Sequence, residues 1–174
     1  MADIHDKVEQ QLTAAEKVIN AIPGWNGYQK RQKRRQSDQL LRKTLADKLE
    51  AQRRRLDTAQ KDLLEHGRLD LVDDVESAST QLKTFADRVR FASYGYAGLF
   101  DAVKIREQEL EQLYNFDAAL VDYVERLDTA NDHLREAISQ GEGVEETIEV
   151  IQEITREANA AFDERQRLIL ESEQ

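Results

Sequence analysis

The sequence predicts an all-α protein that forms an elongated antiparallel helical bundle or coiled coil. Good helix formers, namely Glu, Gln, Lys, Arg, Ala and Leu, dominate the 174 residues. β-Branched residues are sparse and no segment alternates with a period of two, so strands are not indicated. The seven glycines and the single proline occur at only four places in the chain, which predicts a few long helices between them.

Composition excludes several classes of protein. The chain has no cysteine, which excludes disulfides, thiolate zinc sites and cysteine nucleophiles. Charged residues make up 34% of the chain and hydrophobic residues 40%, a balance typical of long exposed helices. No apolar run approaches the ~20 residues that span a bilayer, and the acidic start does not resemble a signal peptide. We therefore expect a cytoplasmic protein with one helical domain over residues 1–174.

The first predicted helix covers residues 3–21. Its apolar residues recur every three or four positions and share one face, and Asp3 is placed to cap its first turn. Pro23 then begins the segment PGWNGY, whose residues favour a turn. Trp25 and Tyr28 are expected to anchor this loop, or to supply a small interfacial anchor at a membrane.

The second predicted helix covers residues 28–66 and ends at Gly67, a plausible left-handed cap. Its apolar stripe begins only at Leu40, because residues 29–39 contain no hydrophobic side chain. Residues 29–55 hold eleven basic and three acidic side chains, a net charge of +8. An exposed basic helix of this kind favours an anionic partner.

One long helix is predicted over residues 70–139. Counting from Leu71 to Ile138 in alternating steps of four and three, seventeen of the twenty positions are apolar, and the phase passes through SYGYAG without slipping. A sustained period of 3.5 predicts left-handed supercoiling against neighbouring helices. The alternative is a break at residues 95–98, which would give a compact five-helix bundle.

The last predicted helix covers residues 143–170, after the turn at Gly141 and Gly143. With a continuous central helix, the chain would form two antiparallel hairpins, residues 28–100 and 100–174, that share the long helix and meet near its middle. Residues 107–174 carry a net charge of −14, so basic and acidic charge lie in different parts of the chain.

Two sets of residues are candidates for binding a partner. The first is a basic patch in the second helix, consisting of Lys30, Arg31, Lys33, Arg34, Arg35 and Arg42. The second is a cluster of aromatic residues and glycines that would serve as a partner site or as a hinge, consisting of Phe91, Tyr94, Gly95, Gly98 and Phe100. Bundle packing and a solvated helix surface are the simpler interpretations of both sets.

The sequence favours a non-catalytic scaffold or adaptor that acts through coiled-coil contacts and self-associates. None of the three histidines follows a Glu-x-x-His pattern, and no phosphate-loop, nucleophile-elbow or calcium-loop motif occurs. No cofactor, metal or small-molecule substrate is implied. The alternative is a peripheral binder of anionic surfaces through residues 29–55; a membrane is possible, whereas the net charge of −10 disfavours nucleic acid.

Three polar residues, Arg106, Asp117 and Asn131, occupy positions of the apolar heptad pattern. Polar residues at such positions fix the register of neighbouring helices more often than they take part in catalysis. We expect that role for all three.

Overall fold

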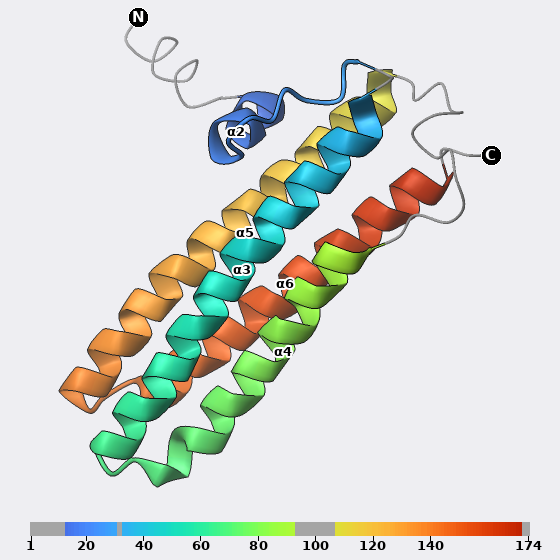
Figure 1. Cartoon of the computed structure of the whole chain (residues 1–174). Coiled ribbons are helices and arrows are strands. Elements are labelled where there is room, and N and C mark those ends of the chain that lie inside the picture. Colours follow the sequence, from blue (N-terminus) through green and yellow to red (C-terminus); the bar gives the residue numbers. More distant parts are fainter. Residues whose placement is uncertain (1–12, 31–32, 93–106, 172–174) are drawn as a thin grey trace, which may run out of the picture.

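The computed structural model describes residues 13–30, 33–92 and 107–171, and this part of the chain is helical with no strand (Figure 1). The helices are α2 (Ala14–Ala21), α3 (Arg34–Glu65), α4 (Val72–Phe91), α5 (Glu107–Gln140) and α6 (Val144–Glu171), with a short 3-10 turn, η2 (Leu69–Leu71), before α4. The predicted all-α bundle is confirmed.

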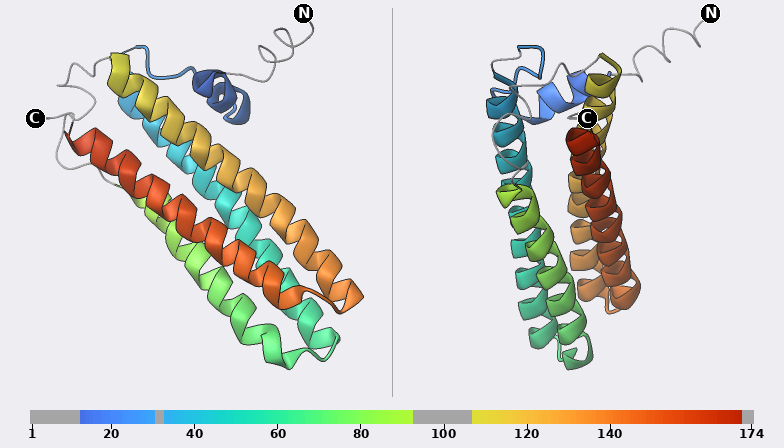
Figure 2. Two further views of the ribbon diagram at one scale, coloured as in Figure 1. Left: turned by 180° about the vertical axis from the view of Figure 1, so that it is seen from behind. Right: turned by 90° about the vertical axis from the view of Figure 1, so that its right-hand side faces the viewer.

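Four of the helices form two antiparallel hairpins that lie side by side. α3 packs against α4, and α5 packs against α6. The hairpins then pack against each other, because α3 also contacts α5 and α4 contacts α6; the second view of Figure 2 shows the two pairs as two layers. The short helix α2 packs against α5, near the end of the bundle where α3 begins (Figure 1).

The prediction of one continuous helix over residues 70–139 is wrong. α4 ends at Phe91, because Ala92 leaves the helical region at φ −55° and ψ 117°. Ser79 of α4 and Asp128 of α5 would lie roughly 70 Å apart in a continuous helix. Yet Ser79 bonds to Asp57 and Asp128 bonds to Gln52, two residues only about one and a half turns apart on α3. The chain has therefore reversed its direction between α4 and α5.

The unbroken heptad phase has another explanation. The apolar seams of α4 and α5 face one common core. Leu82 and Phe85 enter it from α4, and Leu127 and Leu134 enter it from α5. Each helix needs apolar residues at the heptad spacing to fill that core. The spacing therefore stays the same whether the two helices are continuous or separate. The alternative prediction, a compact five-helix bundle, matches the described helices; its proposed break at 95–98 lies outside the described residues.

Two predicted helices begin later than expected. Thr13 is extended at φ −54° and ψ 151°, and with Glu16 it forms a reciprocal capping box that starts α2 at Ala14; the expected Asp3 cap lies outside the described residues. α3 starts at Arg34 instead of residue 28, because the chain around Tyr28 is pinned into the bundle by side-chain contacts. The last helix agrees with its predicted range to one residue at each end.

The loop between α2 and α3 depends on glycine at two positions. Gly24 and Gly27 both have positive φ angles, +77° and +82°, which side chains rarely adopt. A Cβ atom on Gly24 would meet nothing within 4 Å, whereas one on Gly27 would lie 2.6 Å from the hydroxyl oxygen of Tyr114. The Tyr114 ring packs against Trp25 and Tyr28, so it cannot move aside freely.

We predict that Gly27→Ala destabilises the protein more than Gly24→Ala does. Both changes carry the backbone cost of a left-handed residue, about 1–2 kcal/mol. Gly27→Ala adds the clash with Tyr114, and we expect at least ~1 kcal/mol of further loss in the free energy of unfolding. Urea unfolding followed by circular dichroism measures both. Equal losses would show that the loop does not hold Tyr114 against Gly27.

Candidate functional site

The loop before α3 places two aromatic rings inside the bundle. Trp25 and Tyr28 are both buried, and their rings pack edge to face with centroids 5.0 Å apart. The indole Nε1–H donates to the carbonyl oxygen of Ser37 at 2.8 Å, and the backbone N–H of Tyr28 donates to the Tyr114 hydroxyl at 2.8 Å. Trp25 and Tyr28 therefore anchor the loop to the bundle, and the expectation of an interfacial membrane anchor is wrong because neither ring reaches the surface.

The hydroxyl of Tyr28 enters a set of buried charged side chains. It donates to one carboxylate oxygen of Asp117 at 2.6 Å, and Arg165 Nε donates to the other oxygen at 2.6 Å. Arg165 Nη2 also donates to Asp38 at 2.6 Å and to the Tyr28 hydroxyl at 3.1 Å. Arg165 of α6 thus pairs with a carboxylate from α3 and a carboxylate from α5.

Two further arginines extend this set to α4 and to the loop. Arg42 Nε donates to Asp38 at 2.8 Å, and its Nη1 donates to the carbonyl oxygens of Val89 and Arg90 near the end of α4. Arg34 Nε donates to the carbonyl oxygen of Tyr28 at 2.7 Å. We call the whole set the buried charge network; its members are Tyr28, Arg34, Asp38, Arg42, Asp117 and Arg165.

Burial controls the protonation of the network. Burial raises the pKa of Asp117, and the nearby charge of Arg165 and the hydrogen bond from Tyr28 only partly oppose it. Burial, together with the charge of Asp117, raises the pKa of Tyr28 well above its usual range, so its hydroxyl remains a hydrogen-bond donor. Since these groups bond to one another inside the core, the arrangement suits holding helices together better than binding a substrate.

The buried charge network removes two arginines from the predicted basic patch. Arg34 and Arg42 are only 4% and 7% exposed, because they bond inside the bundle, so placing them on a partner-binding surface is wrong. Lys30, Lys33 and Arg35 are exposed, and none of them forms an ion pair with a carboxylate in the described part of the chain. Arg31, the remaining member of the predicted patch, lies outside the described residues.

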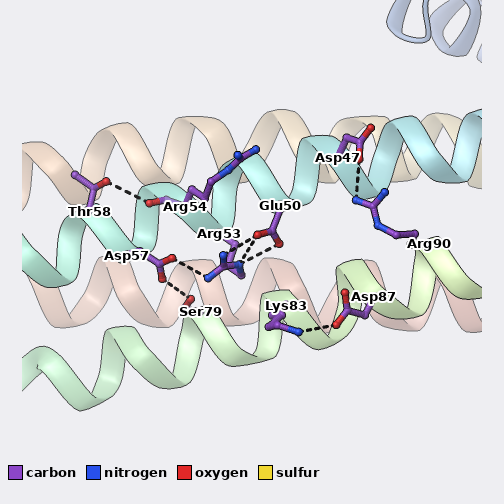
Figure 3. A network of polar contacts seen from close by, with 10 residues as sticks. All are labelled: Asp47, Glu50, Arg53, Arg54, Asp57, Thr58, Ser79, Lys83, Asp87 and Arg90. Atoms are coloured by element: carbon purple, nitrogen blue, oxygen red, sulfur yellow. Dashed lines mark hydrogen bonds and ion pairs between the residues drawn. The ribbon is translucent and has the colours of Figure 1, made fainter.

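Farther along α3, acidic neighbours pair with two of the arginines. Arg53 binds Glu50 and Asp57, and Asp57 in turn accepts a hydrogen bond from a serine of α4 (Figure 3). Arg55 reaches across to Asp128 and Asp132 of α5. Lys48, Arg54 and Lys61 of α3 are exposed as well. We call the exposed cations at and just before its start, Lys30, Lys33, Arg35 and Lys43, the basic end.

The opposite end of the bundle is acidic. There the α3–α4 and α5–α6 turns lie together (Figure 1). Hydrogen bonding to Asp70 raises the pKa of Arg68 in the first turn most strongly, but the charge of Glu145 beyond the second turn contributes too. Exposed carboxylates surround both turns; we call the following set the acidic end: Glu65, Asp73, Asp74, Glu142, Glu145, Glu146 and Glu149.

The polar heptad residues bond across helices as expected of residues that fix register. Asp117 belongs to the buried charge network. Asn131 Nδ2 donates to Gln52 Oε1 of α3 at 2.9 Å, and Gln52 Nε2 donates to Asp128 of α5 at 2.9 Å. Arg106 lies outside the described residues.

The second candidate site is described only at its first residue. Phe91 is 73% exposed at the end of α4, which is compatible with its predicted role in binding a partner. Tyr94, Gly95, Gly98 and Phe100 lie outside the described residues, so their predicted role as a partner site or hinge stays a prediction.

Sequence reasoning missed Asp38 and Arg165, although both leave a signal. Asp38 lies three residues before the buried Leu41, and Arg165 lies three residues after the buried Phe162. Extending the apolar stripes of the second and last helices by this spacing identifies a carboxylate and a guanidinium as core residues. Their opposite charges in different helices are a sign of a buried pair.

Other kinds of site receive no support from the described residues. In residues 13–30, 33–92 and 107–171, no three histidine, aspartate or glutamate side chains are grouped so that they could hold a metal ion. In the same ranges, no helix has the length and apolar character needed to cross a membrane. A groove of about 690 Å³ between α5 and α6 has a mixed lining that favours no class of ligand.

Comparison with models of known protein families, with curated protein sequences and with solved structures finds no match to this chain. A functional proposal therefore rests on the chain's own geometry and charge.

We predict that Arg165→Met strongly destabilises the protein. The change leaves the carboxylates of Asp38 and Asp117 buried without their shared cation, and breaking such a pair costs about 3–5 kcal/mol. Arg167→Met is the matched control, since Arg167 is exposed on the same helix and, among the residues that the structure describes, pairs with Glu164 alone; we expect a loss under ~0.5 kcal/mol. Urea unfolding measures both. A similar small loss for the two variants would contradict a central role for Arg165.

The deficit of Arg165→Met is also expected to depend on pH. Without the arginine, burial raises the pKa of Asp117 further above its unfolded value. A carboxyl whose folded pKa is raised contributes stability below its unfolded pKa and loses that contribution as the pH rises through the folded pKa. The deficit relative to wild type should therefore be smaller at about pH 5 than at about pH 8. A deficit that is equal at both pH values, or that grows as the pH falls, would contradict a further rise in the pKa of Asp117.

Proposed function

We propose that this protein is a non-catalytic helical scaffold or adaptor that acts through protein–protein contacts and associates end to end with copies of itself. The observation that carries the proposal is the charge difference between the two ends of the bundle. Lys30, Lys33 and Arg35 are exposed and without ion-pair partners in the described part of the chain at one end, and carboxylates crowd both turns at the other.

The two ends are too far apart to neutralise each other within one molecule, so each end can attract the opposite end of another copy. α5 has 34 residues and is therefore about 50 Å long. At physiological ionic strength, charges farther apart than ~8 Å are largely screened from each other in water. The two ends of one molecule therefore do not neutralise each other, whereas the basic end of one copy placed on the acidic end of another attracts at short range.

Both ends also expose apolar side chains. Phe91 and Leu170, near the ends of α4 and α6, are 73% and 49% exposed at the end where α3 begins. Leu64 and Leu69, on either side of the α3–α4 turn, are 50% and 67% exposed at the acidic end. Contact between unlike ends would bury these side chains, so the hydrophobic effect would add to the charge attraction.

The contact proposed here uses two different surfaces of the same molecule. Such a heterologous contact leaves one basic and one acidic end free after every addition, so it produces chains or rings instead of closed pairs. A polar chain of bundles, presenting the long helix faces along its sides, is a suitable framework for an adaptor. The cytoplasmic location and the lack of catalysis stay predictions.

Binding to an anionic surface is the second candidate, and the structure weakens one part of its basis. The exposed lysines and Arg35 favour it. The burial of Trp25 and Tyr28 removes the apolar anchor that membrane binding through this region would use. Binding to vesicles would then depend on charge alone and would be lost at moderate salt.

We predict that neutralising the acidic end abolishes self-association. Wild-type protein should form oligomers that grow with concentration at low salt and dissociate at about 0.5 M salt, because screening shortens the range of the attraction. The triple variant Glu142→Gln, Glu145→Gln and Glu146→Gln should remain monomeric. Size-exclusion chromatography with light scattering measures the mass.

The matched control removes the same number of charges elsewhere. Glu125, Asp132 and Glu153 are exposed along the middle of α5 and α6 and lie outside both ends, so their change to the corresponding amides should leave association within about twofold of wild type. A wild-type protein that stays monomeric at high concentration and low salt would disprove self-association. Equal effects of both triple variants would disprove the end-to-end contact.

A further inference from the structure

A hollow of about 300 Å³ lies where the loop after α2 meets the first turns of α3. Its polar lining comes from three amide side chains, one serine and two lysines: Asn26, Gln29, Gln36, Ser37, Lys30 and Lys33. No carboxylate is among the described residues that line it. The two lysines give the hollow a positive lining, which favours an anion locally although the chain carries a net charge of −10.

The two lysines of the hollow have no carboxylate partner in the described part of the chain, as is also true of Lys43, Lys48 and Lys61. Lys17 pairs with Asp122, and Lys83 pairs with Asp87. Lys30 and Lys33 are exposed and make no ion pair with any carboxylate in the described part of the chain. Their ammonium groups therefore remain available to a ligand that enters the hollow.

The walls of the hollow are held in place by the fold. Trp25 lines it from a buried position and donates its indole N–H to the carbonyl of Ser37, which also lines it. Gly24 and Gly27 contribute wall without side chains, so backbone groups face the space. The Tyr114 hydroxyl fixes the loop through the N–H of Tyr28, so a ligand would meet a preformed site with little ordering cost.

The start of α3 adds to the positive field. Lys33 is its N-cap residue, no side chain caps the helix, and its first turn has no acidic residue. The helix dipole at this end therefore favours an anion. The hollow and its two lysines carry the inference, and the helix terminus reinforces them.

We propose that this hollow binds a phosphate group carried by a small molecule or by a lipid headgroup. Ammonium groups form charge-assisted hydrogen bonds with phosphate oxygens, and amide and hydroxyl donors complete their coordination. The volume is at the low end for ligand pockets, so it suits a phosphate with a small attached group better than a dinucleotide. This binding activity goes beyond self-association and does not require it.

Trp25 supplies a direct test, because it is the only tryptophan in the chain and lines the hollow. The probes are inorganic phosphate, glycerol 3-phosphate, and vesicles of phosphatidylcholine with and without phosphatidic acid. The indole N–H resonance should shift saturably with the soluble phosphates and not with sodium chloride of equal ionic strength. If only the phosphatidic acid vesicles bind, the ligand is a lipid headgroup. If the soluble esters bind, it is a small phosphorylated molecule.

A pair of variants separates this site from general charge attraction. Lys30→Gln with Lys33→Gln should weaken binding at least about tenfold, since both ammonium contacts are lost. Lys43→Gln with Lys48→Gln removes the same charge from exposed positions outside the hollow, and it should stay within about twofold of wild type. Equal weakening by both pairs, or no saturable shift with any probe, would overturn the proposal. An unchanged indole resonance in the unliganded variants confirms their fold.

The triple variant with Glu142, Glu145 and Glu146 changed to glutamine separates this inference from the proposed function. It should bind phosphate as wild type does, because all three residues lie at the far end of the bundle. Binding that persists in a monomeric variant supports the site within one chain. Binding that disappears together with association would place the site between two molecules and would overturn the proposal.

Discussion

The pairing of Arg165 with Asp38 and Asp117 constrains the whole structure. A buried charge is costly unless it is paired and hydrogen-bonded, so α6, α3 and α5 must meet in the one register that brings these groups within 2.6 Å. Apolar seams alone tolerate slips between neighbouring helices, because one leucine replaces another at small cost. The buried charge network removes that freedom at one end of the bundle, and the contact of Gln52 with Asn131 removes it farther along.

The same network decides which charges remain at the surface. It takes in Arg34 and Arg42, and the loop that it fixes buries Trp25 and Tyr28. The predicted basic patch is thus divided into two parts. Arg34 and Arg42 hold helices together in the interior, whereas the basic end stays at the surface. A partner can contact the basic end but not Arg34 and Arg42, because a residue that bonds inside the core is unavailable to another molecule.

Much of the fold is predictable from the sequence, because glycines and apolar periods are local signals. The helix class, the turns at Gly67 and Gly141, and the last helix follow from them. The reversal between α4 and α5 does not, since both helices bury seams such as Leu82 and Leu127 in one core and so keep the same period whether joined or separate. Asp38, Asp117 and Arg165 are detectable at the spacing of the apolar seams, but their pairing depends on which helices are neighbours, and that is a property of the topology.

The interior network contains three guanidinium groups and two carboxylates, so the surface is one unit more negative than the chain as a whole. The net charge repels an anion that approaches the molecule, whereas the exposed cations near the start of α3 attract it at short range. Field focusing of this kind directs a partner to one place and one orientation, and it weakens as salt increases. Lysines themselves bind many anions, so the preference of the basic end for a partner depends on where its cations lie. Acidic neighbours strengthen that preference, because they pair with other cations of α3 such as Arg53 and Arg55 and so reduce their attraction for an anion.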